Sequence, residues 1–123
     1  MSRQIIISIL SRSESSPRRV KFCDSFLSRL RGFTFRKNIR NDEGLILVEK
    51  KDSRLDTSIH MFFVWSDLAV FWINASHVVV DKVIAKSWHP YYASKQPARF
   101  VVELHPTQIE AFQVGDKLDF RDD

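Results

Sequence analysis

The side chains in this sequence that could do chemistry are few and widely spaced. The four histidines include no i, i+4 pair on a predicted helix, and none stands at metal-ligand spacing from Cys23. They are His60, His77, His89 and His105. Nothing in the sequence around Cys23 or any serine suggests the base that would activate a nucleophile. We therefore expect no metal and no cofactor, and the sequence leaves open whether the chain is an enzyme.

Basic residues are concentrated in the first 40 positions, where ten Lys or Arg stand against Glu14 and Asp24, while the rest of the chain is net acidic. This asymmetry predicts either a solvated basic face or a surface that meets phosphate. No nucleic-acid-binding motif accompanies it, which favours the solvated face. The residues of the candidate nucleic-acid face are Arg18, Arg19, Lys21, Arg29, Arg36, Lys37 and Arg40.

A second candidate surface is a polar loop bracketed by Pro90 and Pro97, which cannot lie in a central strand because each proline removes a backbone donor. This region carries Trp88, Tyr91 and Tyr92, whose rings combine an apolar body with a polar tip. We expect these three side chains to form an exposed contact loop.

The length of 123 residues predicts one domain with one core, spanning 1–123. Cys23 is the only cysteine, so no internal disulfide can form, which favours a reducing compartment, and we expect a cytoplasmic protein with no signal peptide. The most apolar stretch, Ile59–Ile73, is too short to cross a bilayer and contains Asp67, so we expect no membrane partner.

The first third of the chain predicts a first strand, a loop with a brief extended segment after it, and a helix. Gln4–Leu10 is rich in β-branched Ile and is followed by a Ser-rich loop that ends at Pro17, and Arg18–Phe22 extends briefly. A short helix is predicted over Ser25–Arg31, because its apolar positions follow the 3.6 period and Gly32 suits a left-handed helix end.

From Gly44 onward the pattern is that of strands. They are predicted at Leu45–Glu49, Met61–Trp65, Leu68–Ile73, Val78–Ala85, Arg99–His105 and Lys117–Arg121, with one turn of helix at Gln108–Phe112. The expected class is therefore α+β but mostly β: about seven short strands in a small twisted sheet curled into a partial barrel, with one N-terminal helix.

The order of residues from about Val20 to Phe120 resembles domain-of-unknown-function family 192, a set of small bacterial and archaeal domains. The resemblance is carried by Leu30-Arg31-Gly32-Phe33, Gly44-Leu45-Ile46, His60-Met61 ahead of Phe62 to Ile73, Pro90, Glu103-Leu104 and Gly115-Asp116. It implies a compact β-rich fold and no established activity.

Four positions depart from the family pattern. Thr34 stands where Met is usual, Asp67 and Ala69 stand where a Pro and an Asp are common, and Asn74 stands at a usual Asp. If the family has an acidic site at these positions, this chain has lost or moved part of it.

The resemblance also singles out Arg31, His60 and Glu103 as candidate ligand-binding residues, because a guanidinium near a carboxylate can hold an anion. The alternative is that Arg31 and Glu103 only cap the helix and brace the sheet.

The leading hypothesis is a non-enzymatic binding or interaction domain with a small polar or anion site. The alternatives are an enzyme for a small anionic substrate, with His60 as proton carrier beside Glu103, and weak nucleic-acid binding. The expected partner is a small anion or a protein, and the chain a monomer or homodimer.

Overall fold

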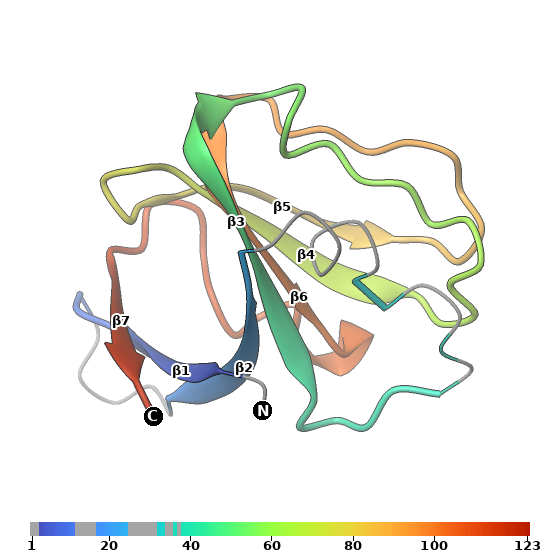
Figure 1. Cartoon of the computed structure of the whole chain (residues 1–123), viewed down its shortest axis with the longest axis horizontal. Helices are drawn as coiled ribbons and strands as arrows, with labels where there is room; N and C mark the ends of the chain where they lie inside the picture. The colour runs from blue at the N-terminus through green and yellow to red at the C-terminus, as the bar shows by residue number, and fades with distance from the viewer. Residues whose placement is uncertain (1–2, 12–16, 25–31, 34–35, 37) are drawn as a thin grey trace.

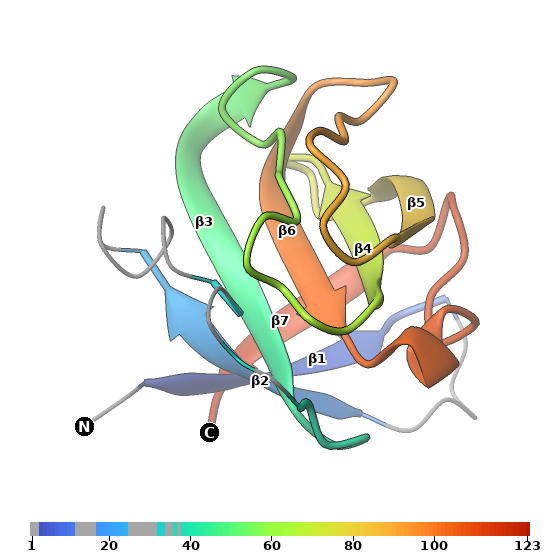
Figure 2. The ribbon, with the colours of Figure 1, turned by 90° about the vertical axis from the view of Figure 1, so that its right-hand side faces the viewer.

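The computed structural model describes residues 3–11, 17–24, 32–33, 36 and 38–123. Its strands are β1 (Gln4–Ile9), β2 (Arg18–Cys23), β3 (Gly44–Ser53), β4 (Leu68–Ile73), β5 (Val79–Ala85), β6 (Ala98–Leu104) and β7 (Leu118–Asp122). They form one sheet in the order β5-β4-β6-β3-β2-β1-β7. The sheet is strongly twisted, so that β1 and β7 cross beneath β3, β6 and β4 (Figures 1 and 2). The fold is a mostly β half-barrel.

The two edges of this sheet meet at one corner. Val78 and Lys117 form an isolated bridge, and the Val79 N–H donates to the Asp116 carbonyl at 2.9 Å. The Leu118 N–H donates to the carbonyl of His77 at 2.8 Å. These bonds join the start of β5 to the start of β7, so the curled sheet closes along part of its edge.

One strand pair in the sheet is parallel. β2 runs parallel to β3, with Lys21 opposite Leu45 and Cys23 opposite Leu47, whereas every other strand pair of the described sheet is antiparallel. Parallel strands cannot be joined by a tight hairpin, and in the sequence Cys23 at the end of β2 is well separated from Gly44 at the start of β3.

The predicted α+β class is wrong. Across the described residues the only helical element is the 3-10 turn η1 (Pro106–Gln108), so the fold is mostly β without an observed α-helix. The helix predicted over Ser25–Arg31 lies outside the described residues. The helical turn predicted at Gln108–Phe112 lies instead two residues earlier, where Pro106 occupies the first turn and the His105 side chain accepts from the Thr107 N–H.

The strand predicted at Met61–Trp65 is also wrong. These residues form a turn in which the Val64 N–H donates to the Met61 carbonyl at 3.2 Å, and Phe63 has a left-handed φ of 60°. Met61 and Val64 are buried while Phe62 and Phe63 are exposed, a pattern that a regular strand with period 2 cannot produce.

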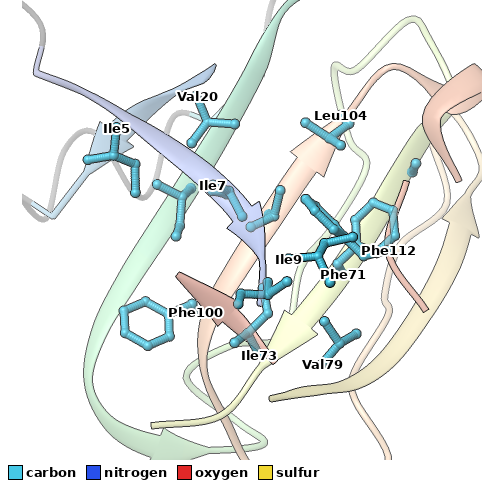
Figure 3. Close-up of a cluster of buried hydrophobic side chains, with 14 residues drawn as sticks. Ile5, Ile7, Ile9, Val20, Phe71, Ile73, Val79, Phe100, Leu104 and Phe112 are labelled. Carbon is cyan, nitrogen blue, oxygen red and sulfur yellow. The ribbon is translucent and has the colours of Figure 1, made fainter. Parts of the chain in front are cut away.

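The sheet packs apolar side chains on both faces. In β6, Phe100, Val102 and Leu104 join the cluster inside the half-barrel, together with Ile7 and Phe71 (Figure 3). The alternating residue Val101 belongs to a second cluster on the opposite face, which includes Trp72 and Met61. Strands buried on both faces explain the continuous apolar run of β4.

The second cluster is covered by the connections between β3 and β4 and between β5 and β6, which run side by side in both views (Figures 1 and 2). The buried Trp72 indole donates from Nε1 to the Thr57 carbonyl at 2.8 Å, which ties the first connection to β4. The part of the chain that the structure describes contains no helix long and apolar enough to cross a membrane.

Candidate functional site

A cleft of about 700 Å³ lies along β2, where that strand pairs with β3. The residues that line it include Cys23, Gly32, Phe33 and Leu45. Five basic and two acidic side chains line it among the described residues: Arg18, Arg19, Lys21, Arg36 and Arg40, with Asp42 and Glu43. The cleft therefore has a net positive lining.

The alternation of β2 places basic side chains beside this cleft. Val20 is buried in the core inside the half-barrel, so its neighbours Arg19 and Lys21 are directed to the other side and are exposed. Arg18 is anchored at the rim, because its Nε donates to Gln108 Oε1 at 3.1 Å. Arg19 forms an ion pair with the Asp123 carboxylate at 2.6 Å.

Arg36, Arg40, Asp42 and Glu43, which also line the cleft, form their own ion pairs. Arg36 donates to both carboxylate oxygens of Glu43 at 2.9 Å, and Arg40 contacts Asp42 at 3.0 Å. The Arg40 backbone N–H lowers the pKa of Glu43, and the Arg40 guanidinium lowers the pKa of Asp42. These two acids stay charged and neutralise their arginines.

Lys21 differs from these arginines. No hydrogen bond or ion pair joins its ammonium group to another described residue. A lysine ammonium is a compact point charge with three donors, and here they are available to an anion in the cleft. Lys21 is thus the basic side chain best placed to bind a ligand.

Gly44 fixes the closest approach of the strands at the end of the cleft. A Cβ built on this residue would lie 2.5 Å from Leu104 Cδ2 and 2.9 Å from Val20 Cγ1. Only glycine allows β3 to begin this close to both side chains.

Glu103 lies near this cleft but does not line it among the described contacts. It is only 5% exposed and stands in register with Leu45 on one side and Val70 on the other. Its Oε1 lies 3.4 Å from the position a Cβ would take on Gly32. Burial raises the pKa of the Glu103 carboxyl to about 7, and no hydrogen bond joins this carboxyl to another described residue. Glu103 is a buried acid that is largely neutral below pH 7.

His60 occupies a different environment. It is exposed, its Nδ1 accepts from the Phe62 N–H at 3.2 Å, and its ring lies 5.6 Å from that of Phe62. No interaction between described residues joins His60 to Glu103, and Arg31 lies outside the described residues. A site formed by Arg31, His60 and Glu103 therefore stays a prediction.

Most residues of the predicted nucleic-acid face lie together. Five of the seven line the cleft along β2, and the other two, Arg29 and Lys37, lie outside the described residues. Sequence reasoning missed Gln108, Asp42 and Glu43. A sequence pattern could have identified the two acids, since they directly follow Arg40 and Asn41 in a polar turn before Gly44. No such pattern identifies Gln108, which is far from these residues in the sequence.

The predicted contact loop is partly exposed. Trp88 and Tyr91 are exposed, whereas Tyr92 is half-buried and its hydroxyl accepts from the Lys86 N–H at 2.9 Å. Sequence reasoning missed Phe63 and Trp65, whose rings lie 4.9 and 5.4 Å from that of Trp88. Both residues fall in the predicted strand Met61–Trp65, so the sequence did not indicate that they belong to a contact surface.

Metal-ligating side chains do not gather in the described ranges. No group of three or more His, Cys, Asp or Glu residues there could hold a metal ion.

A family model matches residues 8–120, that of DUF192, described as "Uncharacterized ACR". The UPF0127 protein TK1120 of Thermococcus kodakarensis is 40% identical over 85 residues, which are 69% of this chain and 52% of that protein. The UPF0127 protein PF1050 of Pyrococcus furiosus is 35% identical over 103 residues, 82% of this chain and 85% of that protein. The chain spans about half the length of the Thermococcus kodakarensis and Thermococcus gammatolerans relatives, 52% and 53%.

Two crystal structures share the fold. A protein from Sinorhizobium meliloti, described as a proposed transcription regulator, superposes with a TM-score of 0.81 at 15% identity, covering 98% of this chain and 94% of that one. A protein of unknown function from Novosphingobium aromaticivorans gives a TM-score of 0.77 at 14% identity, covering 94% and 83%. At these identities the likeness shows the fold alone.

Proposed function

Because this chain belongs to the DUF192 family of uncharacterised proteins, whose description assigns no activity, we propose a function from its own geometry: a non-enzymatic domain that binds a small anion in the cleft along β2. The observation that carries this proposal is the gathering of five basic side chains around one cleft. All five belong to the first 40 residues, where the basic side chains of the sequence are concentrated.

The size of the cleft supports a small ligand. Its volume of about 700 Å³ falls within the range of small-molecule sites, roughly 300 to 1,000 Å³. Phosphate-bearing ligands suit it chemically, since the Lys21 ammonium supplies a point charge with three donors, and lysine is a standard partner of phosphate oxygens. Arg36 and Arg40 are held by Glu43 and Asp42 and serve mainly to shape the wall.

The test is isothermal titration of the purified domain with inorganic pyrophosphate at low salt. Pyrophosphate should bind, and Lys21→Ala should weaken binding about tenfold through loss of one charge-assisted contact. Lys50→Ala is the matched control, because Lys50 is an exposed lysine on the neighbouring strand β3 that does not line the cleft. No binding, or equal loss in both variants, would overturn the proposal.

Nucleic acid is the alternative that the same experiment tests. A 12-nucleotide single strand should bind no tighter than pyrophosphate if the cleft takes a small anion. Much tighter binding of the oligonucleotide that falls steeply with added salt would replace the small-anion proposal with nucleic-acid binding.

We also propose that the domain acts in the cytoplasm, which the single buried thiol of Cys23 supports.

A further inference from the structure

One row of paired residues crosses four neighbouring strands of the sheet, from β2 through β3 and β6 to β4. Lys21 is in register with Leu45, Leu45 with Glu103, and Glu103 with Val70. Residues that pair across a sheet direct their side chains to the same face. Leu45 and Val70 belong to the second cluster, so the side chains of Lys21 and Glu103 are directed to that face as well.

Glu103 is the polar exception among buried neighbours. Leu45 and Val70 beside it are apolar, and so is Val101, two positions earlier on β6. Glu103 is nine-tenths buried or more, and no hydrogen bond or ion pair joins its carboxyl to another described residue. Burying a carboxyl in such surroundings costs stability, and groups of this kind are concentrated at functional sites.

The carboxyl of Glu103 lies directly behind two residues of the cleft along β2. Gly32 and Leu45 both line that cleft. Glu103 is in register with Leu45, and its Oε1 lies 3.4 Å from the position a Cβ would take on Gly32. Because glycine has no side chain, no side chain of residue 32 stands between the carboxyl and the cleft. An anion at this end of the cleft, over Leu45, is therefore beside the carboxyl.

Lys21 stands at the other end of the same row. Neighbouring strands lie about 4.8 Å apart, so the Cα atoms of Lys21 and Glu103 lie roughly 10 Å apart with Leu45 between them. A tetrahedral oxyanion with one hydrogen bond on each side spans roughly 8 Å. One such anion can therefore contact the Lys21 ammonium and the Glu103 carboxyl together.

The alternation of the strands places three further ionisable groups on this face, within or next to β2, β3 and β6: Cys23, Glu43 and His105. Each has a contact of its own. Glu43 accepts from Arg36 at 2.9 Å, and His105 Nδ1 lies 2.8 Å from the Thr107 hydroxyl. The Cys23 thiol donates to a backbone carbonyl at 3.8 Å. The residues that β4 directs to this face are apolar: Leu68, Val70 and Trp72. An anion over Leu45 would thus meet Lys21 and Glu103 without displacing these contacts.

The two groups treat oxyanions differently. An ammonium donates to any oxyanion, and so does a neutral carboxyl, whereas a carboxylate can only accept. An anion beside a carboxylate must therefore carry a proton of its own. Inorganic phosphate carries at least one proton around neutral pH, and sulfate carries none.

Building on the anion site proposed above, we propose that Glu103 determines its specificity, so that the site selects hydrogen phosphate over sulfate. Phosphate bound over Leu45 accepts from the Lys21 ammonium and shares its own proton with the Glu103 carboxylate. Sulfate binds well only when Glu103 is itself protonated. Because burial raises the pKa of Glu103 to about 7, the site distinguishes the two anions above neutral pH and not below it.

The experiment is isothermal titration of the whole chain with sodium sulfate and with sodium phosphate, at pH 6 and pH 8 and at constant ionic strength. With a pKa of about 7, Glu103 is about nine-tenths protonated at pH 6 and about one-tenth at pH 8. The affinity for sulfate should therefore fall about tenfold between these pH values, and the affinity for phosphate should change much less. In Glu103→Gln the amide donates at both pH values, so its affinity for sulfate should be the same at pH 6 and pH 8.

Glu110→Gln is the matched control, since Glu110 is an exposed acid that does not line the cleft, and it should keep the tenfold fall. An affinity for sulfate that is equal at both pH values would overturn this inference, and the unmodified chain alone gives that result. So would a fall that Glu103→Gln leaves unchanged, because another group would then be titrating. If neither anion binds, this inference also fails, and the pyrophosphate titration decides separately whether the cleft binds anions at all.

Discussion

The buried carboxyl of Glu103 gives the sharpest test of this structure, through the change Glu103→Gln. Glutamine has nearly the same shape as a protonated glutamic acid but cannot ionise. Burial raises the pKa of Glu103 from 4.5 to about 7. At about 1.4 kcal/mol per pKa unit, ionisation in the folded state costs about 3 kcal/mol relative to the unfolded chain.

The sign follows from proton binding. The folded state holds this proton more tightly than the unfolded state does, so the free energy of unfolding falls as pH rises from about 4.5 to about 7 and is flat above that window. Glu103→Gln should therefore raise the free energy of unfolding by up to about 3 kcal/mol at pH 8 and change it little at pH 4.5.

The assay is urea denaturation of both proteins across pH 4.5 to 8. Other acids with shifted pKa values, such as Glu43 and Asp67, titrate alike in the two proteins and cancel in the difference. Glu110→Gln is the control, because Glu110 is exposed and its pKa is lowered, chiefly by a hydrogen bond from Gln113, so its change should be small.

One result would refute this reasoning. If Glu103→Gln destabilises the domain at pH 8, the carboxylate must be charged and paired with a cation in the folded state. Arg31 is the cation that the sequence predicts for it. An equal loss in Arg31→Ala, with no further loss in the double variant, would then support the predicted pairing.

Three further changes probe packing and buried hydrogen bonds, and each is measured as the free energy of unfolding in urea. The control is Lys50→Ala, whose free energy of unfolding should lie within about 0.5 kcal/mol of that of the unmodified chain. Gly44→Ala should cost about 2 kcal/mol, because its Cβ would meet Leu104 at 2.5 Å. Trp72→Phe should cost about 2 kcal/mol, since the buried Thr57 carbonyl loses its donor. Lys82→Met should cost about 2 kcal/mol, because its ammonium bonds two backbone carbonyls between β6 and β7. A variant as stable as the control would contradict the contact assigned to it.

The strands with strong local patterns were predictable. Leu68–Ile73 has the bounds predicted for it, because a continuous apolar run in the middle of a sheet is buried on both faces. Met61–Trp65 has a similar composition but forms a turn, because its backbone pairs with residues 88 and 89 rather than with a strand. Local propensity cannot distinguish these cases, since tertiary hydrogen bonds decide between them.

The cleft shows the same division. The surplus of basic residues was evident, and the alternation of β2 makes Arg19 and Lys21 point away from Val20. They line the same cleft as Arg36 and Arg40 because β2 pairs with β3 in parallel, and no short sequence pattern predicts this pairing. The rings of Phe63 and Trp65 likewise meet that of Trp88 only because Met61 pairs with residues 88 and 89, so of these three rings only Trp88 was predicted as a contact residue.

The pairing of β1 with β7 has a consequence for the order in which this domain can form on the ribosome. Within this sheet β1 is synthesised before all the other strands, yet Ile5 to Ile9 pair with residues 118–122 of β7. The corner between β5 and β7 also needs β7. One edge of β1 therefore lacks its partner until almost the entire domain has left the exit tunnel. During that interval an unpaired, isoleucine-rich edge can recruit another strand, so the nascent chain is most prone to aggregation just before its last strand emerges.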